Sequence, residues 1–249
     1  MHLSTPQQVF ENRYDAGRKL AEKLMDYKGK PVVVLAIPNG GVPIALGVAL
    51  ALEADLNLII SRKIPLPLRP EGGFGAVTDD GTMILNDELV RKVGLTQDQI
   101  TFQVASVRKS IRERSLFYHR DLPPASVTGK TVIIVDDGLA SGYTMRAAVE
   151  SVKKRRPGEI IVAVPIASQQ AFHELEKHAS KVVAYVVSSA PRFYLADFYS
   201  YWNEPGEGEV LDCLKEWQLR RMKPKIDFSR GTSKSAPMSS RRPPQAPAR

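Results

Sequence analysis

Cysteine is almost absent from this sequence of 249 residues, which contains one, Cys213. A single cysteine excludes an internal disulfide and a metal site built from clustered thiolates. Long apolar runs are also missing: the longest, Val42–Leu52, ends at Glu53 and is shorter than the roughly 20 residues that span a bilayer. We therefore expect no membrane segment. The N-terminus lacks a basic stretch followed by an apolar one, so we expect no signal peptide and predict a cytoplasmic protein.

Net charge is missing from the body of the chain. The whole protein carries +8, but residues 220–249 hold nine basic residues and one acidic residue, which accounts for all of it. The balanced remainder argues against a uniformly basic nucleic-acid-binding domain. Residues 223–249 are rich in proline, serine and arginine and are predicted to form a disordered tail. This basic tail is a candidate for weak contact with nucleic acid.

Strand-like and helix-like segments alternate along residues 1–222, which we treat as one domain. A first helix is expected to start at Thr5, with Pro6 in its first turn. The β-branched run at 31–37 is typical of a buried parallel strand. Further strands are predicted at 56–61, 131–135, 159–164 and 181–187, and further helices at 42–52, 96–119, 144–156, 168–178 and 207–221. This alternation predicts an α/β protein with a doubly wound, mainly parallel sheet.

A segment rich in proline and glycine precedes the long helix predicted at 96–119. It runs from Arg62 to Gly81, with a hairpin expected around Phe74–Leu85. Loops of this length in compact domains are often lids or binding segments. We therefore predict a flexible loop beside the functional site.

One segment, Val132–Thr144, combines a buried strand with reactive side chains in the sequence VIIVDDGLASGYT. The strand delivers Asp136 and Asp137 to the carboxyl edge of the sheet, where open α/β sheets bind ligands. Small residues follow, and they let backbone N–H groups approach an anion. Ser141 and Thr144 add hydroxyls, and the start of a helix adds a favourable dipole. The loop suits a phosphate monoester, and the carboxylates suit sugar hydroxyls or a divalent metal.

Other α/β proteins contain similar segments. Glycines such as Gly138 and Gly142 are, by themselves, typical of ordinary turns. A pair of acids after an apolar strand also occurs in receiver domains, but there the pair lies near the start of the domain, whereas Asp136 follows three earlier strand signals. No G-x-x-x-x-G-K-[ST] sequence is present, which excludes a Walker loop.

Taken as a whole, VIIVDDGLASGYT resembles the phosphoribosyl diphosphate (PRPP) signature of type I phosphoribosyltransferases. The resemblance extends over most of residues 10–215 and is strongest to a poorly characterised branch whose first strand ends in a Pro-x-Gly-Gly loop. Pro38–Gly41 fits that loop, and Arg62-Lys63 and Gly73–Val77 also match the branch. The resemblance implies the type I phosphoribosyltransferase fold, with a flexible lid loop and a small hood.

The resemblance also implies roles for individual positions. Asp136 and Asp137 are expected to hold the ribose hydroxyls of PRPP, directly or through Mg²⁺, and are the candidate metal ligands. Arg62 and Lys63 are expected to reach the pyrophosphate, and these four residues form the candidate catalytic set. The remaining predicted contacts are the 5′-phosphate cradle, Ala140, Ser141, Gly142, Tyr143 and Thr144, and the pyrophosphate loop, Asn39, Gly40 and Gly41.

The resemblance also implies the conformation or role of three segments. The pyrophosphate loop is expected to contain a non-proline cis peptide bond, residues 64–81 to form the lid, and residues 186–200 to form the hood over the acceptor. Phe193, Tyr194 and Phe198 in the hood are candidates for stacking on a base, although aromatic residues near a chain end more often close a core.

The sequence departs from the family pattern at two positions. Enzymes that act on 6-oxopurines usually carry aspartate where this chain has Ala140, which argues against hypoxanthine or guanine as the acceptor. Relatives often carry arginine or lysine where this chain has Asn39, whose amide brings no charge to the pyrophosphate. Tyr143 either covers the phosphate loop or packs against the fold, and packing is the favoured interpretation.

The implied function is a Mg²⁺-dependent phosphoribosyltransferase that transfers phosphoribose from PRPP to a nucleobase or related nucleophile and releases pyrophosphate, with a homodimer as the expected assembly. Negative charge develops on the leaving group, so cations placed there can supply much of the stabilisation. A non-catalytic PRPP or nucleotide sensor on the same fold is the alternative. Arg62, Lys63 and a lid favour turnover, whereas Asn39 and the basic tail favour regulation.

Overall fold

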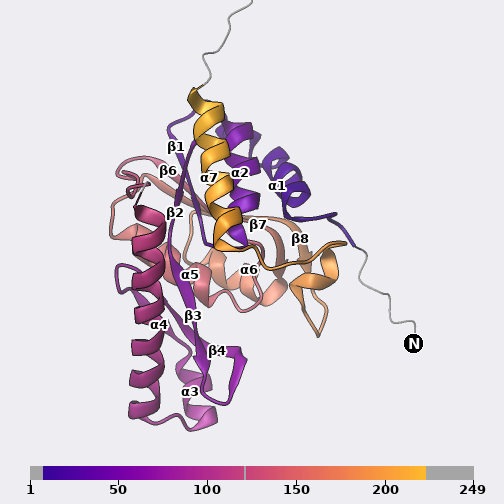
Figure 1. Ribbon diagram of the computed structural model, residues 1–249. Helices are drawn as coiled ribbons and strands as arrows, with labels where there is room; N and C mark the ends of the chain where they lie inside the picture. Colours follow the sequence, from indigo (N-terminus) through magenta and orange to yellow (C-terminus); the bar gives the residue numbers. More distant parts are fainter. Residues whose placement is uncertain (1–7, 121, 223–249) are drawn as a thin grey trace, which may run out of the picture.

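A computed structural model describes residues 8–120 and 122–222 of the chain (Figure 1). Its centre is a sheet of five strands in the order β2-β1-β6-β7-β8, in which every neighbouring pair is parallel. The strands are β1 (Val32–Ala36), β2 (Asp55–Leu58), β6 (Thr131–Val135), β7 (Glu159–Ser168) and β8 (Lys181–Ser188). The predicted α/β class with a parallel sheet is confirmed.

Helices cover both faces of this sheet (Figure 1). Residues of β1 alternate between two hydrophobic clusters: Val32, Val34 and Ala36 belong to one, and Val33 and Leu35 to the other. Such alternation is expected for a strand that is buried on both sides. The first cluster is covered by α1 (Arg13–Glu22), α2 (Gly41–Leu52) and α7 (Glu207–Met222), and the second by α5 (Tyr143–Lys153) and α6 (Gln169–Glu176). The sheet is therefore doubly wound.

The first helix begins later than predicted. Asn12 caps α1 by accepting a hydrogen bond from the Asp15 amide at 3.0 Å, so the helix starts at Arg13. Phe10 lies in a β-bridge with the segment that follows β8 rather than on a helix. The predicted cap, Thr5, lies outside the described residues. A one-turn helix, η1 (Met25–Tyr27), separates α1 from β1.

The segment rich in proline and glycine forms strands, so the prediction of a long loop is wrong. A second, antiparallel sheet consists of β3 (Ser61–Leu66), β4 (Arg69–Thr78) and β5 (Met83–Leu85). The hairpin expected around Phe74–Leu85 is present as β4 and β5. Glycine is required within it, because a Cβ at Gly75 would lie 2.4 Å from the Ile84 carbonyl oxygen. The strands escape sequence analysis because glycine and proline are depleted in ordinary strands. That residues 64–81 act as a lid stays a prediction.

Two helices extend this second sheet into an arm that projects from the main sheet (Figure 1). The short α3 (Asp87–Val93) has no counterpart in the sequence prediction. The predicted long helix is present as α4 (Gln97–His119), and a capping box between Thr96 and Gln99 begins it. α4 packs along β3 and β4. We call β3–β5 with α3 and α4 the arm.

The hood, residues 186–200, begins within the last strand, β8, and contains the one-turn helix η2 (Leu195–Phe198). The Phe198 carbonyl accepts hydrogen bonds from the Val9 and Phe10 amides, both at 3.0 Å. Residues 201–206, which we call the connector, then lead to α7. These contacts tie the hood to the start of the described chain.

The last described helix, α7, packs on α2, and the Trp217 indole donates to the Ala54 carbonyl at 3.1 Å. No helix in the described part of the chain is long and apolar enough to cross a membrane. The predicted disordered tail, 223–249, lies outside the described residues.

Candidate active site

The carboxyl ends of β1 and β6 meet where the candidate site lies. The chain moves outward from β1 to β2 on one side and from β6 through β7 to β8 on the other, so the direction of winding reverses between β1 and β6. Ligands of open α/β sheets bind at such a switch point. The loop 37–41 follows β1, and Asp136 and Asp137 follow β6. Two separately predicted parts of the site therefore share one edge of the sheet.

Glycine allows the loop 37–41 to lie directly against the aspartate pair. A Cβ at Gly40 would lie 2.0 Å from Asp137 Oδ2, and a Cβ at Gly41 would lie 2.7 Å from the Val135 carbonyl oxygen. Neither contact is possible for a real side chain unless the loop or, at Gly40, the Asp137 carboxylate moves. The Pro-x-Gly-Gly sequence is thus explained by the close approach of two backbone segments.

The Asn39 side chain is engaged by the protein itself. Its Oδ1 accepts hydrogen bonds from Arg114 Nη1 at 2.9 Å and from the Tyr118 hydroxyl at 3.0 Å, and its Nδ2 donates to the Pro205 carbonyl at 2.8 Å. The peptide bond that precedes Asn39 is cis, as the family resemblance predicted. The backbone N–H groups of Asn39 and Gly40 donate to no acceptor among the described residues. The loop therefore offers a ligand its backbone and not the Asn39 amide.

Asp136 and Asp137 lie side by side and are partly buried, and Asp136 Oδ1 accepts a hydrogen bond from the Asp137 amide at 2.8 Å. Burial and, after it, the charge of Asp137 raise the pKa of Asp136. Burial also raises the pKa of Asp137, although the Arg13 guanidinium opposes that change. A divalent cation stabilises such a carboxylate pair. The pair suits Mg²⁺, which proteins often hold through one or two carboxylates while substrate oxygens and water complete the shell.

A buried arginine that the sequence analysis missed holds Asp137. Arg13, at the start of α1, is 5% exposed and donates to Asp137 Oδ2 from Nη2 at 2.8 Å and from Nε at 3.1 Å. It also donates to the Asn203 carbonyl, and its guanidinium carbon lies 3.9 Å from the centre of the Trp202 ring. These partners lie far from Arg13 along the chain, so no local sequence signal identifies it.

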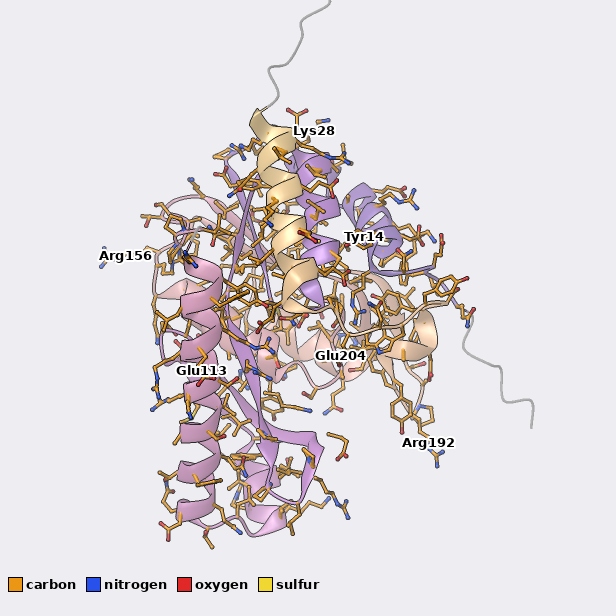
Figure 2. The ribbon with its side chains drawn as sticks, in the orientation of Figure 1. Tyr14, Lys28, Glu113, Arg156, Arg192 and Glu204 are labelled. Carbon is orange, nitrogen blue, oxygen red and sulfur yellow. The ribbon has the colours of Figure 1, made fainter. Side chains whose placement is uncertain are left out.

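The aspartate pair opens into a cleft of about 330 Å³. The predicted residues Asn39, Gly40 and Thr144 line it together with charged side chains from α1, β3, α4, the end of β6 and the connector. These charged residues are Arg13, Arg62, Lys63, Arg114, Asp136, Asp137 and Glu204. Figure 2 shows Glu204 in the middle of the molecule, between the arm and the hood. Arg114 and Glu204 were not predicted.

The two predicted basic residues make different contacts. Arg62 is partly buried, and its Nη1 donates to Ser110 Oγ on α4 at 2.6 Å. Burial and, after it, the nearby Arg114 lower the pKa of Arg62. Lys63 is exposed and donates to the Glu71 carbonyl at 2.6 Å. Both line the cleft, but only Arg62 is held by a side chain of the long helix.

Comparisons with known proteins show the family of this chain. The phosphoribosyl transferase domain family matches residues 78–193. The crystal structure of TT1426 from Thermus thermophilus is 34% identical, has a TM-score of 0.68, and aligns with 84% of this chain and 98% of its own. The chain belongs to the type I phosphoribosyltransferase family. A candidate phosphoribosyl transferase of Mycobacterium tuberculosis is 34% identical over 206 residues, which is 83% of this chain and 46% of that protein. The chain thus spans about half the length of this curated relative.

The phosphoribosyltransferase signature lines a second hollow, of about 600 Å³. Its loop residues there are Ala140, Ser141, Gly142 and Tyr143, whereas Thr144 lines the first cleft. Gly142 has a φ of +77°, and a Cβ there would lie 2.8 Å from Leu175 Cδ2. The backbone N–H groups of residues 140–144 donate to no acceptor in the described ranges. The loop therefore has the shape and the donors of an anion cradle.

Tyr143 lies outside both hydrophobic clusters. It is partly buried and lines the 600 Å³ hollow. Its position therefore differs from the favoured expectation that it packs against the fold.

A third hollow, of about 530 Å³, lies between Ala140 and the hood. Phe193 lines it, whereas Phe198 is buried, and their ring centres are 5.7 Å apart. Tyr194 is 62% exposed. Phe198 therefore closes a core, and Phe193 is the candidate stacking residue whose ring borders this hollow.

Proposed function

We propose that the protein is a Mg²⁺-dependent phosphoribosyltransferase that transfers phosphoribose from PRPP to a nucleobase or a related nucleophile and releases pyrophosphate. One observation carries this proposal: a carboxylate pair, the glycine loop 37–41 and three guanidinium groups share one cleft, and the phosphate cradle continues from it through Thr144. Asp136 and Asp137 hold the ribose hydroxyls in this proposal, residues 140–144 the 5′-phosphate, and loop 37–41 the pyrophosphate.

The proposed reaction breaks the bond between C1 of ribose and a pyrophosphate oxygen. Both electrons leave with pyrophosphate, and an acceptor nitrogen uses its lone pair to form the new bond to C1 and releases its proton to water. Arg62 and Lys63 face the charge that grows on the leaving group, while Asp136 and Asp137 face the sugar, which becomes cationic. Bound Mg²⁺ supplies further positive charge at the pyrophosphate.

The hollow beneath the hood is the proposed acceptor site. Besides Phe193 it is lined by hydroxyl and amide groups, including those of Ser168, Gln170 and Ser188. These groups suit a neutral, polar heterocycle. Ala140 at its edge brings no carboxylate, so we do not propose a 6-oxopurine whose N7 is protonated by an aspartate.

Pyrophosphate release from PRPP with Mg²⁺ and a panel of bases tests the function. We expect turnover with at least one base, and we expect Asp136→Asn to lower kcat/KM about 100-fold or more. Asp136 is the better target, because Asp137 also holds the buried Arg13 and its substitution affects folding. Unchanged turnover in a folded Asp136→Asn protein would refute the assignment.

A specific observation also favours the alternative, a PRPP or nucleotide sensor. In the connector, the Pro205 carbonyl accepts a hydrogen bond from Asn39 and Glu204 lines the cleft, so parts of the chain itself lie on the pyrophosphate side. Tight PRPP binding without turnover on any base would establish the sensor and exclude the transferase.

Three further proposals concern surroundings and partners. We propose a homodimer, testable by sedimentation, and a cytoplasmic location, which the single cysteine supports.

We also propose that the basic tail contacts nucleic acid weakly. Truncation after Arg221 should then leave turnover intact and remove salt-sensitive RNA binding. RNA binding that survives truncation would reject the role of the tail.

A further inference from the structure

The proposed pyrophosphate loop has no charge of its own. Residues 37–41 are Ile, Pro, Asn, Gly and Gly. The Asn39 amide is already used by Pro205, Arg114 and Tyr118. A pyrophosphate bound at this loop therefore requires its cations from elsewhere in the fold.

α4 brings two such cations to the loop. Arg114 contacts Asn39 directly, and Ser110, one turn earlier on the same face of α4, accepts the hydrogen bond of Arg62. Both guanidiniums line the cleft. In Figure 2, Glu113, the neighbour of Arg114, marks this level of α4.

The electrostatics of this pair favour a bound anion. Arg62 and Arg114 are close enough that Arg114 contributes, after burial, to the lowered pKa of Arg62. Among the described residues neither guanidinium forms an ion pair, although the Glu204 carboxylate lines the same cleft and acts on Arg62. Two neighbouring cations in a partly buried cleft are stabilised by a polyanion placed between them.

We propose that Arg114 is a pyrophosphate-binding residue and that Asn39 is its positioning residue. The inference rests on the proposed function. Only Nη1 of Arg114 is bonded to Asn39, so Nη2 and Nε can donate to phosphate oxygens in the forked geometry that suits this group. All residues of the 5′-phosphate cradle except Thr144 line the other hollow, and Arg114 does not, so Arg114 is expected to act on the pyrophosphate end.

Calorimetric titration of the full chain with PRPP and Mg²⁺, and separately with ribose 5-phosphate, tests this inference. In Arg114→Gln we expect PRPP affinity to fall about tenfold or more, because a charge-assisted contact is removed. Ribose 5-phosphate lacks the pyrophosphate, so its affinity should stay within about twofold of the wild-type value.

Two control variants separate charge from loop support. Tyr118→Phe removes the other hydrogen bond to Asn39 Oδ1 without removing charge, and Arg112→Gln removes an exposed cation of α4 that lines a different hollow. Both should retain PRPP affinity within about threefold. If Arg114→Gln does not fold, Arg114→Lys replaces it, with an expected loss of about fivefold for PRPP alone, which exceeds the limit set for the two controls.

The possible outcomes are distinct. Wild-type affinity for PRPP in the Arg114 variant, an equal loss for ribose 5-phosphate, or an equal loss in Tyr118→Phe would overturn the inference and leave the proposed function intact. Absence of PRPP binding by the wild-type protein would overturn both.

Discussion

In the cleft proposed to hold the ribose and the pyrophosphate, which we call the pyrophosphate end, the charged groups come from widely separated parts of the chain, whereas at the proposed phosphate end the donors come from one continuous loop. The first group consists of Arg13 on α1, Arg62 on β3, Arg114 on α4, the aspartates after β6, and Glu204 in the connector. The second is the backbone of residues 140–144. One end is made by tertiary packing of side chains and the other by local backbone shape.

This difference has a physical origin. Backbone N–H groups are present at every residue except proline, so a loop needs only small residues and the right φ/ψ values to point several of them at an anion. Side-chain charges must be carried to a common point by separate elements. We therefore expect the pyrophosphate end to be sensitive to the loss of side-chain contacts and the phosphate end to be sensitive to changes in backbone shape.

The largest expected effect on stability is at the pyrophosphate end. Arg13→Met leaves Asp137, whose side chain is 17% exposed, without its cation. We expect the free energy of unfolding, measured by urea denaturation, to fall by about 3 kcal/mol. In the control Arg18→Met the lost guanidinium is 73% exposed and pairs with Asp15, so the loss should stay below about 1 kcal/mol. Equal losses would show that burial of the Arg13 pair has no special role.

The next effect tests the contact between loop 37–41 and the aspartates. Gly40→Ala places a methyl group 2.0 Å from Asp137 Oδ2, so the loop or the carboxylate must move. Overpacking of this kind costs about 1–3 kcal/mol, and we expect PRPP affinity to fall about tenfold. Gly208→Ala is the matched control, because its Cβ has nothing within 4 Å. Unaltered affinity in Gly40→Ala would contradict the close approach.

At the phosphate end, backbone shape should matter more than side-chain chemistry. Gly142→Ala strains a φ of +77° and brings Cβ to 2.8 Å from Leu175 Cδ2, so affinity for PRPP and for ribose 5-phosphate should fall together, by about tenfold. Ser141→Ala removes one exposed hydroxyl and should change both affinities less than about threefold. A larger loss of affinity in Ser141→Ala than in Gly142→Ala would show that side-chain chemistry matters more than backbone shape at this end.

The smallest effect lies away from both ends, where the arm meets α5. Burial alone would raise the pKa of Asp80, but hydrogen bonds from Thr78 and Thr82 and the charge of Lys154 outweigh it and lower the pKa to about 2. A depressed pKa stabilises the fold above the unfolded value of about 3.9, and this stabilisation is lost as pH falls toward 2. Asp80→Asn should therefore be slightly less stable than wild type at pH 6, and the difference should shrink by pH 2.

Urea denaturation at several pH values measures that difference, which should stay below about 1 kcal/mol because the pair with Lys154 is largely exposed. A difference that does not depend on pH would contradict the role of the Asp80 carboxylate. PRPP affinity should not change in this variant, since Asp80 lines neither the 330 Å³ cleft nor the 600 Å³ hollow.

Much of the fold follows from local patterns. The β-branched runs became strands of the central sheet, and Thr96 begins α4 as its sequence indicates. The start of α1 was predicted wrongly, and the segment that forms β3 and most of β4 was predicted to be a loop. In the first case the Asn12 side chain caps a helix that begins at Arg13, and in the second the strands contain glycine and proline, which are depleted in ordinary strands.

The sequence by itself determined the phosphate end of the candidate site: a strand, two aspartates, a loop of small residues and a helix follow one another without interruption, and their geometry is local. Only the tertiary structure decided which further charged side chains lie at the proposed pyrophosphate end. Arg13, Arg114 and Glu204 carry no local signal, because their meeting depends on how α1, α4 and the connector pack around the switch point of the sheet. Packing, and not chain proximity, sets the charge around the proposed leaving group.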